Sequence, residues 1–316
     1  MATANQLKML IKSHFDESND KFNTIALQIA AHEAKLGHTN LATDIRKIID
    51  SSKLSRPRLK NIDPNLQGLF LEIYPQEWLS DLIVSSSIKQ RIERIINEFV
   101  HKDKLFRHNL ENRRKILFAG HPGTGKTMTA SIIANELHLP MYIILMDKIV
   151  TKYMGETSAK LRQIFDFIEE QPAVYLFDEF DAIGGQRSND NDVGEMRRVL
   201  NSFLQFIERD HSDSLIIAAT NNLELLDQAL FRRFDDVIHY QLPSDTEKIQ
   251  LLQSRFGSSI SNNELKSILP EIGTLSHAEI NQACLDAIKE SVLKDKKINK
   301  DLIMKTIIDR KAAYKL

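Results

Sequence analysis

The residues with the clearest chemistry form one short run, Gly120-His121-Pro122-Gly123-Thr124-Gly125-Lys126-Thr127. Its glycines let the backbone turn so that successive N–H groups point into one hollow, which suits a phosphate group. Lys126 supplies a cation for the outer phosphates of a nucleotide, and Thr127 supplies a hydroxyl for Mg²⁺. These residue types at this spacing predict a loop that binds a nucleoside triphosphate.

The segments on either side supply the geometry that phosphate binding needs. Residues 115–119 are apolar and predict a buried strand. Residues 128–137 predict a helix, whose N-terminus adds positive potential beneath the phosphates. The order strand, loop, helix favours nucleotide binding over a structural glycine-rich turn, because such a turn leaves Lys126 and Thr127 unexplained.

A second set of polar residues follows another predicted strand. Residues 173–177 are apolar, and Asp178 and Glu179 come directly after them. At a strand end beside the phosphate loop, Asp178 can hold Mg²⁺ through water, and Glu179 can polarise the water that attacks the γ-phosphate. The alternative is a strand that ends in two carboxylates by chance. The offset of roughly 50 residues from the loop suits two strands of one sheet and favours the catalytic interpretation.

The composition limits the class of protein. The chain has 316 residues, enough for two or three domains. Its 42 basic and 43 acidic residues nearly balance, which disfavours nucleic acid as a target and gives no pull toward a membrane. The single cysteine, Cys284, excludes an intramolecular disulfide framework and fits a reducing compartment. Without a signal-peptide pattern or a long apolar run, we expect a cytoplasmic protein with no transmembrane helix.

The apolar pattern divides the chain into four parts. Residues 1–52 predict three short amphipathic helices that form a small bundle, and residues 53–78 predict a solvated linker. In residues 79–243, strand-like runs alternate with helices, which favours a parallel, doubly wound α/β sheet. Residues 244–316 predict helices only. The expected strands are 115–119, 141–146, 173–177, 215–220 and 237–242.

Taken together, these motifs resemble the AAA ATPases proper, the AAA+ branch that includes FtsH, katanin and spastin. Residues 177–187 resemble the Walker B stretch, and residues 218–221 resemble the sensor-1 strand. Residues 226–235 resemble the second region of homology, and residues 276–280 resemble the sensor-2 start of the lid helix. The resemblance covers about residues 79–312 and leaves the N-terminal bundle uncovered.

The resemblance implies a P-loop α/β core, a small all-α lid and hydrolysis of ATP with Mg²⁺. It assigns Glu179 to activating the lytic water, Asn221 to orienting it, and Thr127 and Asp178 to holding Mg²⁺. For His277 the alternative to nucleotide binding is a capping or packing role in the lid helix. Besides Gly120 to Thr127, the residues expected to contact the nucleotide are Met128, Ile83 and His277.

The resemblance also implies a ring of identical subunits, a hexamer, with ATP at each subunit interface. Arg232 and Arg233 would be arginine fingers, because an always-charged planar donor stabilises the charge of phosphoryl transfer on the neighbouring subunit. The alternative is that they make only local contacts with carboxylates such as Asp235 and Asp236. The family often has Pro-Gly between its two arginines, so in this adjacent pair the main finger stays open.

A loop after the second expected strand indicates what kind of work ATP hydrolysis would drive. Lys152, Tyr153 and Met154 resemble the pore loop of AAA unfoldases. An apolar pair at a loop tip fits contact with a threaded polypeptide, and the alternative is an aromatic packed against its own domain. The first interpretation predicts a protein unfoldase or remodeller.

Residues 1–52 would then recruit a protein substrate or partner, with a structural appendage or an oligomer contact as the alternative. The other candidate function is an ATP-driven assembly switch that regulates a partner enzyme without threading. A separate protease is one candidate partner: if the protein serves proteolysis, the protease is another chain, because the sequence has no protease motif of its own.

Overall fold

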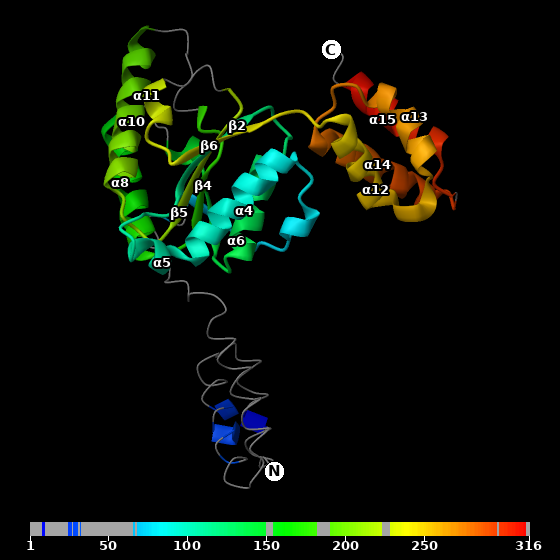
Figure 1. Ribbon diagram of the computed structural model, residues 1–316. Coiled ribbons are helices and arrows are strands. Elements are labelled where there is room, and N and C mark those ends of the chain that lie inside the picture. Colours follow the sequence, from blue (N-terminus) through cyan, green and yellow to red (C-terminus); the bar gives the residue numbers. More distant parts are fainter. Residues whose placement is uncertain are drawn as a thin grey trace. The chain divides into compact units, whose positions relative to one another are not determined.

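The structure of the protein is a computed structural model (Figure 1). The chain divides into two units, residues 1–58 and 59–316. Within the first unit, the described residues 25–26 and 28–30 are helical, and the apolar side chains among them are buried. Most of the predicted bundle lies outside the described residues. The structure describes residues 8–9, 25–26, 28–30, 32, 66, 68–149, 154–181, 190–222, 228–295 and 297–313.

The second unit is built on one six-stranded sheet of order β1-β3-β4-β5-β2-β6. Strands β2 to β6 pair in parallel, and β1 pairs antiparallel with β3 at one edge. Every side chain of β4 and β5 is buried, as a parallel sheet covered on both faces requires. The predicted parallel α/β fold is therefore confirmed. The strands are β1 (Phe70–Ile73), β2 (Lys115–Gly120), β3 (Met141–Ile144), β4 (Val174–Phe177), β5 (Leu215–Thr220) and β6 (Asp236–Tyr240).

The edge strand corrects one part of the expected domain division. Residues 53–78 were expected to be linker, but residues 70–73 form β1, with Phe70 opposite Ile144 on β3. Phe70 is buried and its ring packs against Tyr142 and Phe167. The strand is held by these long-range contacts, so the linker prediction is wrong for these residues.

Helices cover both faces of the sheet (Figure 1). One apolar core joins the sheet to α4 (Ser86–Val100) and α6 (Lys126–Glu136), and the other joins it to α8 (Met154–Glu170) and α10 (Asp190–Arg209). None of the described helices is long and apolar enough to cross a lipid bilayer. The shorter helices of this part are η1 (Leu79–Asp81), α5 (Lys102–Phe106), α7 (Met146–Ile149) and α11 (Gln228–Phe231).

A four-helix lid follows β6 and has an apolar core of its own. Three of its helices begin with a capping box, in which a serine caps the backbone and a glutamate three residues on bonds back. The pairs are Ser244 with Glu247, Ser261 with Glu264, and Ser276 with Glu279. The helices are α12 (Asp245–Phe256), α13 (Asn262–Ile272), α14 (His277–Leu293) and α15 (Lys300–Ala313), with the short η3 (Gly257–Ser259) after α12.

Candidate nucleotide site

The loop between β2 and α6 has a backbone that only glycine adopts easily. The φ angles of Gly120, Gly123 and Gly125 are +147°, +71° and +97°. A Cβ atom on Gly120 would lie 2.1 Å from the carbonyl oxygen of Tyr240 on β6. Glycine at this position therefore lets β2 end tightly against β6 before the chain turns over the start of α6.

Lys126 lies at the centre of the site. Its Nζ donates to the carbonyl oxygens of Gly120 at 2.7 Å and His121 at 2.9 Å. It also donates to Oδ1 of Asn221 at 2.8 Å, so the predicted sensor residue meets the loop. Burial lowers the pKa of Lys126, and the nearby carboxylate of Asp178 opposes this shift. The ammonium is thus held between the loop and the end of β5.

The carbonyl oxygen of His121 also accepts from Oγ1 of Thr124 at 2.7 Å, which tightens the loop. His121 is exposed and borders a hollow of about 500 Å³ that Asn221 and His239 also line. Thr124 itself is buried, so its predicted nucleotide contact would come from its backbone N–H.

The two residues expected to hold Mg²⁺ are in direct contact. Oγ1 of Thr127 donates to Oδ2 of Asp178 at 2.8 Å. In the part of the chain that the structure describes, no group of three or more His, Cys, Asp or Glu side chains is placed to hold a metal alone. The pair fits Mg²⁺ nevertheless, because this ion takes one or two protein oxygens and completes its shell with phosphate oxygens and water.

Glu179 follows Asp178 in an unusual backbone conformation. Its φ is +52°, and its N–H donates to Oδ1 of Asp178 at 2.9 Å. A residue other than glycine in this region stores strain of about 1–3 kcal/mol, and such residues cluster at functional sites. The side chain is exposed, so a water molecule has access to its carboxylate.

Asp181 joins the ends of two strands and had no role in the sequence-based prediction. Its Oδ1 accepts from Oγ1 of Thr220 at 3.1 Å and from the backbone N–H of Asn221 at 3.2 Å. These bonds fix the residue that contacts Lys126. The available signal was a third carboxylate in the Walker B-like stretch, three residues after Asp178.

The lid reaches the loop at the start of α14. The N–H of Ala278 donates to the carbonyl oxygen of Gly123 at 2.9 Å. Oγ of Ser276 lies 2.6 Å from where a Cβ on Gly123 would be, and Ser276 rather than His277 caps the helix. His277 lies between Ser276 and Ala278 in the chain. Both of its ring nitrogens are buried without a hydrogen-bond partner among the described residues. Unpaired ring nitrogens on a residue whose two chain neighbours touch the phosphate loop fit a nucleotide contact.

The remaining predicted contacts are less defined. Ile83 is half-buried between η1 and α4, and Met128 is 39% exposed in the first turn of α6. Contact of either residue with the nucleotide stays a prediction. Lys152 and Tyr153 lie outside the described residues, and Met154 opens α8.

Arg232 and Arg233 do not join the site of their own chain. They precede β6, and the next residue but one, Asp235, accepts from the backbone N–H of Lys115 at the first residue of β2. Because β2 has six residues that rise about 3.3 Å each, its two ends lie roughly 17 Å apart. The arginines lie at one end and the phosphate loop at the other.

Comparison of the sequence with known proteins assigns the chain to a family. Residues 116–242 match the family model described as ATPase family associated with various cellular activities (AAA). A relative named uncharacterized AAA family ATPase, from Sinorhizobium fredii (strain NBRC 101917 / NGR234), is 32% identical over 306 residues, 94% of this chain and 92% of the relative. The chain belongs to the AAA family of ATPases. Its activity is therefore ATP hydrolysis, and the nucleotide of its site is ATP.

Two longer relatives resemble part of this AAA ATPase. The proteasome-activating nucleotidase of Methanoregula boonei is 29% identical over 242 residues, 72% of this chain and 54% of the relative. The peroxisomal ATPase PEX6 of Candida glabrata is 33% identical over 233 residues, 68% of this chain and 23% of the relative. The chain thus spans about half of the first and a quarter of the second.

Acid is expected to destabilise the AAA ATPase partly through His277. Burial holds the pKa of His277 below its ordinary value of 6.5 in the folded chain, although Glu247 acts in the opposite direction. The unfolded chain therefore binds a proton first as the pH falls, so stability is full above pH 6.5 and declines below it. Urea unfolding between pH 7.5 and 5 should show a flatter profile for His277→Gln, by at most about 1.4 kcal/mol per pH unit.

The exposed His108 provides the control for this measurement. His108→Gln shows how far the replacement of an exposed histidine by glutamine changes the profile by itself. Equal slopes for wild type and His277→Gln would show that burial of this ring does not couple to protonation.

Proposed function

We propose that this AAA ATPase hydrolyses ATP with Mg²⁺ in a ring of identical subunits, a hexamer, and unfolds or remodels a protein drawn through the pore. The carrying observation is the separation of Arg232 from the phosphate loop of its own chain. A group that stabilises phosphoryl transfer but lies at the far end of β2 acts on a neighbour's nucleotide, and repeated head-to-tail contacts of this kind close into a ring.

The residues at the end of the sheet have separate tasks in this proposal. Bound Mg²⁺ would neutralise charge on the β- and γ-phosphates. Thr127 and Asp178 hold the ion, and Lys126 turns from its carbonyl partners toward the phosphates. Glu179 accepts a proton from the attacking water, and Asn221 orients that water. His277, Ile83 and Met128 contact the rest of the nucleotide.

A protein substrate is supported by the relatives and by the pore-loop pattern. One relative is named for activating the proteasome, and the residues from Lys152 to Met154 have the aromatic and apolar types that grip a polypeptide. Within this proposal the chain belongs to the branch with FtsH, katanin and spastin, which its motifs resemble. Residues 1–52 recruit the substrate or partner, a separate protease included, and the balanced charge and single cysteine fit the cytoplasm.

Trapping is the experiment that tests the assembly and supplies a substrate. Glu179→Gln with ATP and Mg²⁺ should sediment as one closed ring and retain bound proteins from a lysate of its source cells. The same trap without residues 1–52 should form the ring but retain fewer of them. A trap that stays monomeric with saturating ATP would exclude the ring.

The pore loop decides between unfolding and switching. Tyr153→Ala should unfold a trapped protein at least tenfold more slowly while ATP hydrolysis stays within about twofold, because a lost aromatic contact weakens the grip and not the active site. Unfolding is followed by hydrogen exchange of the substrate. Phe106→Ala, which removes an aromatic that is 78% exposed on α5, is the matched control. Unchanged unfolding by Tyr153→Ala would favour the assembly switch over threading.

A further inference from the structure

The turn that carries the two arginines is fastened at both ends. Before them, Leu230 is fully buried, and after them Phe234 is 7% exposed in the same apolar core. The N–H of Arg233 donates to the carbonyl oxygen of Leu230 at 3.0 Å. The backbone of the turn is thus a fixed platform and not a free loop.

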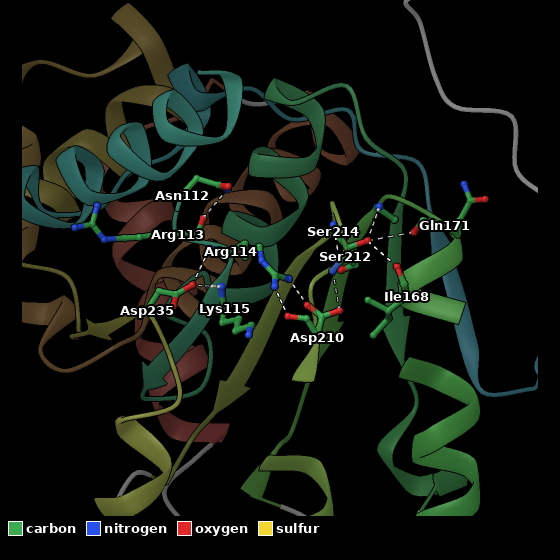
Figure 2. A network of polar contacts seen from close by, with 11 residues as sticks. Asn112, Arg113, Arg114, Lys115, Ile168, Gln171, Asp210, Ser212, Ser214 and Asp235 are labelled. Carbon is green, nitrogen blue, oxygen red and sulfur yellow. Dashed lines mark hydrogen bonds and ion pairs between the residues drawn. The ribbon is translucent and has the colours of Figure 1, made fainter. Parts of the chain in front are cut away.

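Asp235 ties this platform to the central strand. Its Oδ2 accepts from the backbone N–H groups of Arg114 and Lys115, each at 2.9 Å. Its own N–H donates to the carbonyl oxygen of Lys115 at 2.8 Å. Three hydrogen bonds therefore join one exposed residue to the start of β2, and Figure 2 shows the carboxylate turned toward these two residues.

The same strand start is tied to the end of α10. The guanidinium of Arg114 forms an ion pair with the carboxylate of Asp210, which is 1% exposed, and also donates to its carbonyl oxygen. Figure 2 shows Arg114 lying between Asp210 and Asp235. One network thus runs from α10 through β2 to the arginine turn.

The two arginines differ in what they contact. Arg233 forms an ion pair with Glu208 in the last turn of α10. Arg232 is exposed and has no ion-pair or hydrogen-bond partner within the described ranges. The local-carboxylate alternative therefore holds for Arg233, with Glu208 as the partner, because Asp236 is engaged by Arg91 and Asp235 by backbone N–H groups.

We propose that Arg232 is the group presented to the neighbouring subunit, that Arg233 anchors the turn within its own subunit, and that Glu208 and Asp235 are positioning residues for Arg232. This inference rests on the proposed ring. A group supplied in trans must be held within a fraction of an ångström, since a displacement of about 1 Å can cost 10²-fold in rate. Because Arg233 is anchored to its own subunit, the turn holds the backbone of Arg232 at a fixed position and directs its side chain the same way in every subunit.

The experiment distinguishes damage to a subunit's own nucleotide site from damage to the arginine that this subunit supplies to its neighbour. Glu208→Ala and Asp235→Ala should each lower ATP hydrolysis of the ring roughly 10- to 100-fold, with ATP affinity within about threefold of wild type. Each is then mixed with excess Glu179→Gln subunits, which cannot hydrolyse ATP but carry an intact arginine turn. Hydrolysis per Glu208→Ala or Asp235→Ala subunit should rise to the level of wild-type subunits in the same mixture.

Conservative variants separate the two arginines. Arg233→Lys keeps a cation for Glu208 and should hydrolyse ATP within about threefold of wild type. Arg232→Lys loses the planar fork and should fall at least about 100-fold. The opposite order would overturn the assignment of Arg232.

A nearby exposed ion pair supplies the matched control. Asp213 pairs with Lys102 at 2.7 Å, and it lines the same hollow as Arg114. Asp213→Ala should hydrolyse ATP at the wild-type rate, alone and in mixtures.

The outcomes distinguish the inference from the proposal beneath it. If Arg232→Ala and Arg233→Ala are both normal, or neither is restored by Glu179→Gln subunits, arginine donation in trans fails. If Arg232→Ala is restored but Glu208→Ala and Asp235→Ala are normal or stay impaired in the mixture, only the positioning roles fail. Asp235→Ala also removes backbone contacts, so Glu208→Ala keeps the test valid should that variant not fold.

Discussion

Replacing Glu179 with glutamine should lower ATP hydrolysis by about 10²- to 10⁴-fold while ATP still binds. Glutamine has the same length but cannot take a proton from water at neutral pH. The loop, Lys126 and the contact of Thr127 with Asp178 do not involve the Glu179 side chain, so the phosphate site stays intact. Phosphate release under saturating ATP measures the rate, and equilibrium binding of a fluorescent ATP analogue measures affinity.

The control for this variant is an exposed glutamate away from the site. Glu169→Gln, on α8, removes the same charge and should leave hydrolysis unchanged. A Glu179→Gln rate within threefold of wild type would remove Glu179 from the base role. Lost affinity with a lost rate would instead indicate a disturbed loop, which the positive φ of this residue makes a separate outcome.

The site could be predicted where its chemistry is local in sequence. The phosphate loop needs a strand, three glycines, a lysine and a helix start in immediate succession, and each leaves its own mark on the sequence. The starts of the lid helices could be predicted equally well, because residues such as Ser261 and Glu264 have the spacing of a capping box. In both cases the partners are only a few residues apart.

The missed features depend on partners far along the chain. β1 lies in a segment with prolines and no clear period, and its pairing with β3 joins residues some seventy positions apart. Arg114 meets Asp210 across 96 positions, and Asp235 meets Arg114 across 121. The sequence shows that an arginine can pair with a carboxylate. Only the folded sheet determines which of the 43 acidic residues lies next to a given arginine.

Gly120→Ala should destabilise the second unit by more than about 4 kcal/mol, an exceptional value for one methyl group. The φ of +147° is unfavourable for any L side chain, and the new Cβ would lie 2.1 Å from the carbonyl oxygen of Tyr240. That oxygen belongs to the backbone of β6, which pairs with β2 at this residue, so the overlap is relieved only by separating the strands. Urea unfolding measures the loss.

A glycine in the lid separates the clash from the backbone strain. Gly257 has a φ of +54°, and a Cβ there would meet nothing within 4 Å. Gly257→Ala should therefore cost only the strain of a positive-φ backbone, roughly 1–3 kcal/mol. If Gly120→Ala cost no more than this, the two strands could part without penalty, and the end of β2 would not be the rigid support from which the phosphate loop is built.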